Sequence, residues 1–358
     1  MKLGTVFSGI GAIEEALKQF NIDFDTVFAC DNGERNLDVS FEEICKNNPY
    51  DQTNINRYVN ELYESTKKIN FVKTSYMENH GANNLDWYED IRFIDGKNYK
   101  NKIDLFVGGS PCQSFSIIGK RAGLNDTRGT LFFEYARLIN EIRPKVFIFE
   151  NVKGMLGHDK GATWDVIKGV FNSLDYTIFY DVLNSMNYGI PQNRARLFVV
   201  GFAKKVKFDF PNQYKLTKTL EDYLETDVEA KYYLGKKGFE FVTNRKYQNR
   251  AKVDQRIIST QKANQQFNWN GDFVMEEYDQ NKHNHLVDTK AYIGEYKGKL
   301  GYIRKLTPRE CLRLMGFSDD FRIAVPDKEI YRQSGNSIVV DVLKELVIQI
   351  LKVVDFNE

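Results

Sequence analysis

The sequence predicts an α/β fold built on a mostly parallel sheet, with a smaller second domain inserted near its end. Short apolar runs have the length and composition of buried strands, at 3–7, 26–30, 103–107, 145–149 and 197–201. Amphipathic segments typical of helices alternate with them, at 13–20, 130–142 and 164–174. Such alternation indicates parallel strands joined by helices. It stops near residue 208, and an apolar helix near the C-terminus returns the chain to the sheet.

The predicted domains are therefore discontinuous in sequence. Residues 1–207 and 327–358 form the main domain, and residues 208–326 form the inserted one. The insert includes a helix within 304–317, for which Thr307 is the predicted N-cap and Glu310 completes a capping box. Gln333 to Ser337 is expected to open the final helix.

Composition narrows the class of protein. The 358 residues suffice for one large and one smaller domain. The net charge of +1 means that any nucleic-acid affinity must come from a local patch. The four cysteines include no Cys-x-x-Cys pair, which indicates reduced thiols and no metal site. The chain has no apolar run of membrane-spanning length and lacks the features of a signal peptide, so we expect a cytoplasmic protein.

The first strand runs into a glycine turn, Phe7-Ser8-Gly9-Ile10-Gly11, and then a helix. Strand, glycine turn and helix open a nucleotide-binding βαβ unit, although tight packing alone also selects such turns. Asp31 follows the next strand, where a carboxylate can accept hydrogen bonds from a ribose. A helix N-cap is the alternative role for Asp31.

A second turn, Gly108-Gly109-Ser110-Pro111-Cys112, follows the strand at 103–107. The glycines allow a sharp bend and Pro111 stiffens it, so the Cys112 thiol is held at the carboxyl end of a strand. Ligands bind at that edge of open α/β sheets. A loop with an incidental cysteine is the alternative.

Two further groups belong to the same sheet edge. Glu150 ends the strand at 145–149, and a carboxyl group buried among apolar residues can carry a proton near neutrality. Arg194 and Arg196 alternate before the strand at 197–201, so they point the same way if the segment is extended. Their guanidinium groups suit a phosphate or a base carbonyl. Helix capping and surface ion pairing are the alternatives.

Basic and amide-rich segments suggest a polyanionic partner. The loop at 119–129 combines glycines with Lys120, Arg121 and Arg128. The insert carries stretches rich in Arg, Asn and Gln, which are the side chains that pair with guanine and adenine edges. The candidates there are Arg245, Arg250, Asn264 and Gln265. Composition alone would also fit a polar loop domain.

Together these motifs resemble the DNA cytosine-C5 methyltransferases, most closely in length the bacterial restriction-modification members. The resemblance covers residues 1–47, 103–205 and 302–350. Its motifs occur in the family's order: Phe7 to Gly11, Pro111-Cys112-Gln113, Glu150-Asn151-Val152, Gln192 to Arg196, Arg309 to Phe317 and Gly335-Asn336-Ser337. It implies a Rossmann-like, S-adenosylmethionine-dependent methyltransferase domain with an inserted target-recognition domain.

The resemblance also implies roles for single residues. Cys112 would be the nucleophile that adds to cytosine C6, Glu150 would bond N3 and the exocyclic amine, and Arg196 would hold O2, supported by Arg194. S-adenosyl-L-methionine, which leaves as S-adenosyl-L-homocysteine, would be bound by Phe7, Gly9, Ile10, Gly11, Asp31, Asn32, Asp90, Ile91, Pro111, Asn336 and Ser337. Double-stranded DNA would be contacted by Gln113, Ser116, Lys120, Arg121, Arg128, Arg245, Arg250, Asn264 and Gln265.

The resemblance also implies partners for the protein. The bacterial restriction-modification members imply a monomer, and they suggest a cognate restriction endonuclease encoded alongside it. Asn32 stands where the family often has an aromatic residue, so adenine packing is expected to differ. A transfer-RNA cytosine is the alternative substrate, and an inert DNA-binding protein on the same scaffold is the alternative class. The amide-rich insert favours duplex DNA, because the deep major groove of RNA admits no such reader.

Overall fold

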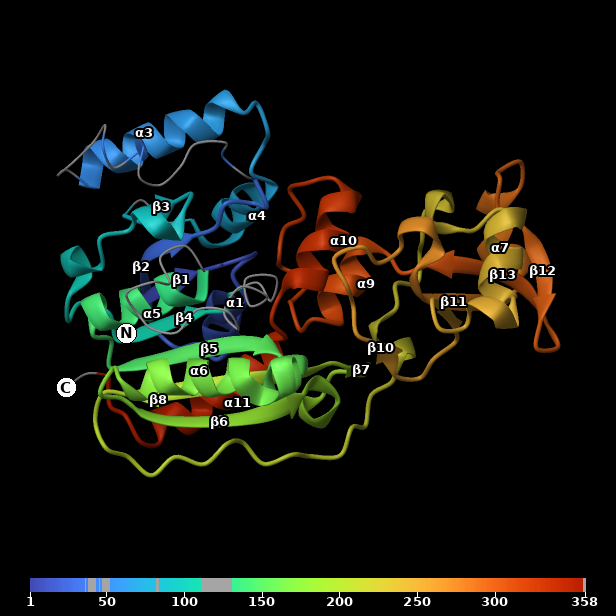
Figure 1. Ribbon diagram of the computed structural model, residues 1–358. Coiled ribbons are helices and arrows are strands. Elements are labelled where there is room, and N and C mark those ends of the chain that lie inside the picture. Colours follow the sequence, from blue (N-terminus) through green and yellow to red (C-terminus); the bar gives the residue numbers. More distant parts are fainter. Residues whose placement is uncertain are drawn as a thin grey trace. The chain divides into compact units, whose positions relative to one another are not determined.

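The computed structural model describes residues 1–35, 37, 43–44, 46, 52–81, 84–110 and 131–356. Two compact units make up the described chain (Figure 1). The first unit comprises 1–183, 195–212 and the C-terminal segment from 342, and the second comprises 184–194 and 213–341. No helix within these described ranges is both long and apolar enough to span a membrane.

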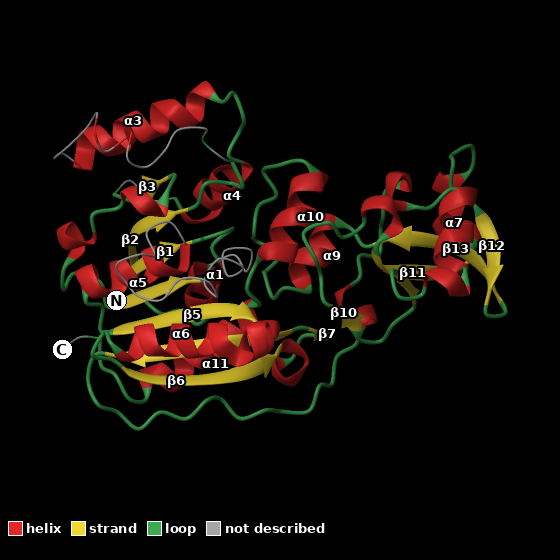
Figure 2. Ribbon diagram, viewed as in Figure 1, coloured by secondary structure: helices red, strands yellow, loops and turns green. Residues whose placement is uncertain are grey.

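A seven-stranded sheet forms the centre of the first unit (Figure 2), and its strands follow the order β3-β2-β1-β4-β5-β8-β6 (Figure 1). Strands β3, β2, β1, β4 and β5 are mutually parallel, and β8 is antiparallel to β5. The strands are β1 (Lys2–Val6), β2 (Asp25–Cys30), β3 (Asp86–Tyr88), β4 (Leu105–Gly108), β5 (Val146–Val152), β6 (Thr177–Asn184) and β8 (Ala195–Phe202). The strand order reverses direction at β1 and β4, which is where open α/β sheets bind ligands.

Both faces of this sheet are buried. In β5, Phe147 and Phe149 belong to a core shared with α5 and α6, whereas Val146 and Ile148 point the other way and are equally inaccessible. Because side chains alternate along a strand, apolar layers cover both faces. The helices of this unit are α1 (Ala12–Gln19), α3 (Gln52–Ser65), α4 (Phe71–His80), α5 (Leu131–Ile142), α6 (Ala162–Asn172) and α11 (Val340–Leu351).

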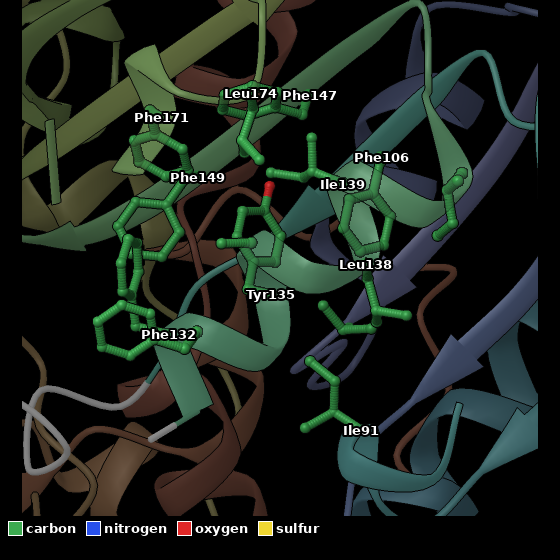
Figure 3. Close-up of a cluster of buried hydrophobic side chains, with 14 of the residues drawn as sticks. Ile91, Phe106, Phe132, Tyr135, Leu138, Ile139, Phe147, Phe149, Phe171 and Leu174 are labelled. Carbon is green, nitrogen blue, oxygen red and sulfur yellow. The ribbon is translucent and has the colours of Figure 1, made fainter. Parts of the chain in front are cut away.

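A cluster of buried aromatic and aliphatic side chains joins α5 and α6 to β4 and β5 (Figure 3). Tyr135 of α5 stacks on Phe106 of β4 with ring centroids 5.0 Å apart. Its hydroxyl donates to the backbone oxygen of Ile148 at 2.9 Å. The buried hydroxyl is therefore satisfied, and α5 is fixed against the two strands that carry the candidate site.

The second unit contains a four-stranded sheet in the order β12-β13-β11-β9. These strands are β9 (Ala251–Val253), β11 (Gly271–Glu277), β12 (Ile293–Tyr296) and β13 (Lys299–Lys305), and β7 (Gln192–Asn193) pairs with β10 (Ile258–Ser259). The helices are α7 (Lys236–Thr243), α8 (Gln280–His283), α9 (Pro308–Arg313) and α10 (Asp327–Asn336). The alternation of strands and helices ends near residue 208, and the chain beyond it forms a second sheet with a different topology.

The capped helix of the second unit follows its prediction. Thr307 is the N-cap of α9, its hydroxyl accepts from Glu310 N at 3.1 Å, and the Glu310 side chain accepts from Thr307 N at 2.8 Å. Glu310 also forms a two-pronged ion pair with Arg304, whose nitrogens lie 2.9 Å from both carboxylate oxygens. Arg304 is fully buried, so the pair joins β13 to α9 in the interior.

Three boundaries differ from those predicted. The insert begins after residue 212, the chain returns at 342, and residues 184–194 belong to the second unit. The last difference arises because Gln192 and Arg194 make buried hydrogen bonds to that unit. A further correction concerns Gln333 to Asn336, which end α10 and do not open the final helix.

The polar stretch between 49 and 100 contains α3, α4 and β3. Tyr76 of α4 is fully buried and packs with Ala29 and Trp87. Weak periodicity therefore concealed a helix that is anchored by a few aromatic contacts.

Candidate active site

The glycine turn after β1 is tied to the end of β2. Gly9 N donates to Asp31 Oδ2 at 3.0 Å, and Gly33 N donates to Asp31 Oδ1 at 2.8 Å. Ser8 N donates to the backbone oxygen of Cys30 at 3.1 Å. Burial raises the pKa of Asp31, while the two backbone donors oppose that shift. Each carboxylate oxygen has a second lone pair, so Asp31 retains acceptor capacity toward a ligand.

The backbone of this turn has positive φ angles, as turns that a ligand approaches closely often do. Phe7, Gly9 and Gly11 have φ values of +53°, +55° and +81°. A Cβ at Gly9 would meet nothing within 4 Å among the residues that the structure describes, whereas a Cβ at Gly11 would lie 2.2 Å from the ring of His80. Gly9 therefore faces open space, and Gly11 is required by packing. This open cradle beside Asp31 fits a nucleoside-like cofactor.

The other predicted adenine-side residues lie near Asp31 but have partners of their own. Asp31 N donates to the backbone oxygen of Tyr88 at 3.1 Å, so Asp90 and Ile91, which follow β3, are at the same sheet edge. Asp90 is buried, and its carboxylate accepts from Tyr63 Oη at 3.1 Å and from Arg92 Nη2 at 2.6 Å. Ile91 and Ile10 are buried, and the Asn32 amide bonds within its own turn.

Glu150 and Arg196 meet at the candidate catalytic centre. Glu150 lies on β5 and Arg196 on the antiparallel neighbour β8, and Glu150 Oε1 is 3.2 Å from Arg196 Nε. Their side chains are 14% and 18% exposed, so they are accessible without being fully solvated. A carboxylic acid and a guanidinium in this arrangement can donate to the ring nitrogen and carbonyl oxygen of one base.

The backbone that leads to Cys112 runs beside this pair. A Cβ at Gly109 would lie 2.8 Å from the backbone oxygen of Glu150 and 3.0 Å from its Oε2, so only glycine allows this approach. Asn151 Nδ2 donates to the backbone oxygen of Ser110 at 2.7 Å. Residues 111–130 lie outside the described ranges, and with them the predicted Pro111, Cys112, Gln113, Ser116, Lys120, Arg121 and Arg128.

Arg194 is placed differently from Arg196. Whereas Arg196 lies within β8, Arg194 lies at the single position between β7 and β8. Its guanidinium is buried and donates to the backbone oxygens of Gln261 (2.8 Å), Gly335 (3.1 Å) and Ser337 (2.8 Å). These contacts join three segments of the second unit, so the geometry fits a positioning residue.

The remaining candidates belong to the second unit. Asn336 is exposed and Ser337 is buried at the end of α10. Arg245, Arg250 and Asn264 are exposed.

Gln265 is a correction to the predicted DNA-contacting set. It is buried, and its amide nitrogen lies 2.8 Å from both Tyr331 O and Ser334 Oγ. This amide is committed to the interior of the second unit, so we no longer propose that it reads bases.

Two residues near the glycine turn carried no role in the sequence analysis. Asn70 Nδ2 donates to the backbone oxygen of Asp31 at 2.9 Å and to Glu89 Oε2 at 2.8 Å. Glu14 is fully buried in α1 and accepts from Tyr76 Oη at 2.5 Å. Burial raises the pKa of Glu14 to about 7. Nothing in the sequence indicates that the adjacent acids Glu14 and Glu15 are both buried, and no motif surrounds Asn70.

Comparison with known proteins agrees with this geometry. The family model for C-5 cytosine-specific DNA methylase matches residues 52–352. Type II methyltransferase M.SsoII of Shigella sonnei is 37% identical over 312 residues, which are 86% of this chain and 77% of the relative. Type II methyltransferase M.HhaI of Haemophilus parahaemolyticus is 34% identical over 263 residues, which are 71% and 77% of the two chains.

Solved structures share the fold at low sequence identity. The S. pombe Dnmt2 methyltransferase has a TM-score of 0.65 at 18% identity, and 98% of each chain is covered. The Entamoeba histolytica methyltransferase EhMeth has a TM-score of 0.67 at 18% identity, also with 98% of each chain covered. The match of the family model over most of the chain, together with these relatives, shows that this protein belongs to the C-5 cytosine-specific DNA methylase family.

Proposed function

We propose that the protein is a site-specific DNA (cytosine-5-)-methyltransferase that modifies DNA within a restriction-modification system. The pairing of Glu150 with Arg196 beside the backbone that leads to Cys112 carries this proposal. The relatives M.SsoII and M.HhaI are both named Type II methyltransferases, which supports duplex DNA as the substrate.

S-adenosylmethionine is the proposed cofactor, and the first unit has residues that fit it. Asp31 would accept from the ribose hydroxyls, and the open side of Gly9 would allow the cofactor to approach the backbone closely. Asp90, Ile91 and Asn32 would lie toward the adenine, and Asn336 and Ser337 toward the methionine end. When bound, the cofactor supplies the methyl group that cytosine C5 receives.

The chain's own residues would activate the base. The target cytosine must leave the stack before its ring carbons can be reached. The Cys112 thiolate would then bond to C6 while the Glu150 carboxyl gives a proton to N3, which makes C5 electron-rich enough to take a methyl group. Arg196 would hold O2 throughout. The C5 proton would then leave to solvent, the sulfur would leave C6, and N3 would return its proton to the Glu150 carboxylate. These steps restore the aromatic ring, the thiolate and the acid.

The remaining proposed roles concern binding. Arg194 would keep the second unit in the conformation that the site needs, through its three backbone acceptors. Lys120, Arg121 and Arg128 would contact phosphates, and Gln113 and Ser116 would lie close to the extruded nucleotide. Arg245, Arg250 and Asn264 would contact the duplex.

Methyl transfer to competing substrates tests the proposal. The protein is incubated with labelled S-adenosylmethionine and an equal mixture of unmethylated genomic DNA and bulk transfer RNA, and the labelled bases are identified. The expected product is 5-methylcytosine in DNA. Label in transfer RNA alone would favour the alternative substrate, and no label in either pool would contradict the proposed reaction. Cys112→Ser is the matched control, and it should bind DNA without transferring label.

A further inference from the structure

A small polar cavity in the second unit has a basic rim. It has a volume of about 40 Å³ and is lined by residues of β9, β10, β11 and their connections, which is room for a few water molecules. Exposed cations at its edge are Arg250, Lys252 and Lys262. Arg250 has no ion-pair partner among the residues that the structure describes. The Arg250 guanidinium is therefore available to an external ligand, whereas Lys252 and Lys262 interact with the Asp272 carboxylate in the cavity lining.

Arg250 differs from the lysines because aromatic rings hold it. Its guanidinium carbon lies 5.7 Å from the centroid of the Phe241 ring, within the range of a cation–π contact. Phe241 in turn stacks on Tyr247, with centroids 4.1 Å apart and planes 11° from parallel, and packs against Trp269 at 5.1 Å. The ring beneath the guanidinium is thus fixed from two sides.

The backbone of Arg250 is held as well. Its N–H donates to the oxygen of Tyr247 at 2.8 Å, and its own oxygen accepts from Gly271 N at 2.9 Å. The residue directly precedes β9, so it is presented from the edge of a sheet. A side chain that is ordered before binding loses little conformational freedom when it binds.

We propose that Arg250 determines sequence specificity by reading a guanine in the major groove. This inference rests on the proposed function, because it concerns the duplex that carries the target cytosine. A guanidinium can donate two parallel hydrogen bonds to guanine O6 and N7, a pattern that the other bases do not offer. The contact with the Phe241 ring restricts the positions that this fork can take.

Arg245 provides the matched comparison within the same segment. It is exposed, it lies on the 3-10 turn Arg245–Tyr247, and no ring contact to its guanidinium is present among the described residues. An exposed cation without such a ring contact suits a phosphate, which carries no sequence information. The two arginines should therefore differ in what their loss changes.

The test begins with the target sequence. The wild-type protein is expressed in a host that lacks cytosine methylation, and bisulfite sequencing of the host genome gives the preferred site. Initial methylation rates are then measured on a duplex with that site and on duplexes in which each guanine outside the target pair is replaced in turn. Wild-type, Arg250→Lys, Phe241→Leu and Arg245→Lys proteins are compared, and their S-adenosylmethionine affinities are measured.

Arg250→Lys should lower discrimination at one guanine position by about 5- to 150-fold and leave the other positions unchanged. Phe241→Leu keeps the guanidinium but loosens it, so the same position should be affected less. Arg245→Lys should change rates on all duplexes alike. The inference would be overturned if Arg250→Lys and Phe241→Leu both discriminated against the replaced guanines as the wild type does. It would also be overturned if Arg250→Lys lost rate uniformly on all duplexes. If the wild-type protein methylates no cytosine at all, the proposed function fails instead.

Discussion

Glu150 Oε1 lies 3.2 Å from Arg196 Nε where the antiparallel strands β5 and β8 pair. Val152 is the direct partner of Arg196 in this register, so Glu150 and Arg196 are diagonal neighbours on one face of the sheet. Each side chain therefore limits the positions open to the other. A base bound between them would meet an acid and a cation whose separation the sheet has already set.

Replacement of the acid should slow the reaction without preventing binding. Glu150→Gln keeps the shape of the side chain but removes the proton that N3 would take, so kcat should fall by about 10²- to 10⁴-fold. S-adenosylmethionine affinity should be unchanged. Steady-state kinetics with labelled cofactor provide the measurement, and Asp165→Asn, an exposed acid on α6, is the control. Wild-type kcat in Glu150→Gln would exclude the assigned role.

Loss of Arg194 should mainly lower stability, whereas loss of Arg196 should mainly lower activity. Arg194→Ala leaves three backbone oxygens without their donor, so the unfolding free energy should drop by about 3 kcal/mol or more. Arg196→Ala should lower kcat/KM by about 10- to 150-fold with a smaller change in stability, because it removes a charged donor from the base. Thermal unfolding and kinetics on both variants separate these effects. Equal stability losses would show that both arginines are structural.

Substitutions at Gly9 and Gly11 should distinguish an effect on S-adenosylmethionine binding from an effect on stability. Gly9→Ala places its methyl group in open space at a cost of about 1–2 kcal/mol for the positive φ, so its main effect should be weaker S-adenosylmethionine binding. Gly11→Ala must also displace the ring of His80, so it should lower the melting temperature more. Calorimetric titration and thermal melts check this. Unchanged cofactor affinity in Gly9→Ala would contradict the proposed cradle.

A buried carboxyl group in the second unit should make stability depend on pH. Burial raises the pKa of Asp272 to about 6, against an opposing effect of Ser259 N and of Lys252 and Lys262. Its folded pKa exceeds the unfolded value of 3.8, so the stability it contributes is present below pH 3.8 and lost as the pH rises through 6. Asp272→Asn should remove this dependence. The difference in unfolding free energy between variant and wild type should change by about 3 kcal/mol between pH 4 and pH 8. A difference that is constant with pH would contradict the assignment.

The framework of the fold could be predicted because its signals are local. The apolar runs of β4 and β5, the glycine turn after β1 and the capping box at Thr307 each follow from adjacent residues. Glu150 and Arg196 were assigned by their motifs, and the sheet brings them together through pairing that no local pattern encodes.

Positions that depend on long-range packing could not be predicted in this way. Gln265 carries the same kind of amide side chain as the exposed Asn264 next to it in the sequence. Only its contacts to Tyr331 and Ser334 show that it is internal. Arg194 and Arg196 also differ through distant contacts, which alternation along the segment does not reveal. Arg194 donates to backbone oxygens of the second unit, whereas Arg196 pairs with Glu150. Asn70 supports Asp31 from a distant helix, with no motif to mark it.

The covalent step offers the most direct test of the proposed mechanism. A duplex with the preferred site is prepared with 5-fluorocytosine at the target position, where fluorine cannot leave as the C5 proton does. With S-adenosylmethionine present, the wild-type protein should form a complex with the DNA that survives denaturing electrophoresis, and Cys112→Ser should form none. The proposed mechanism would be contradicted if the wild-type protein bound cofactor and duplex yet formed no such complex. It would also be contradicted if Cys112→Ser formed as much of the complex as the wild type.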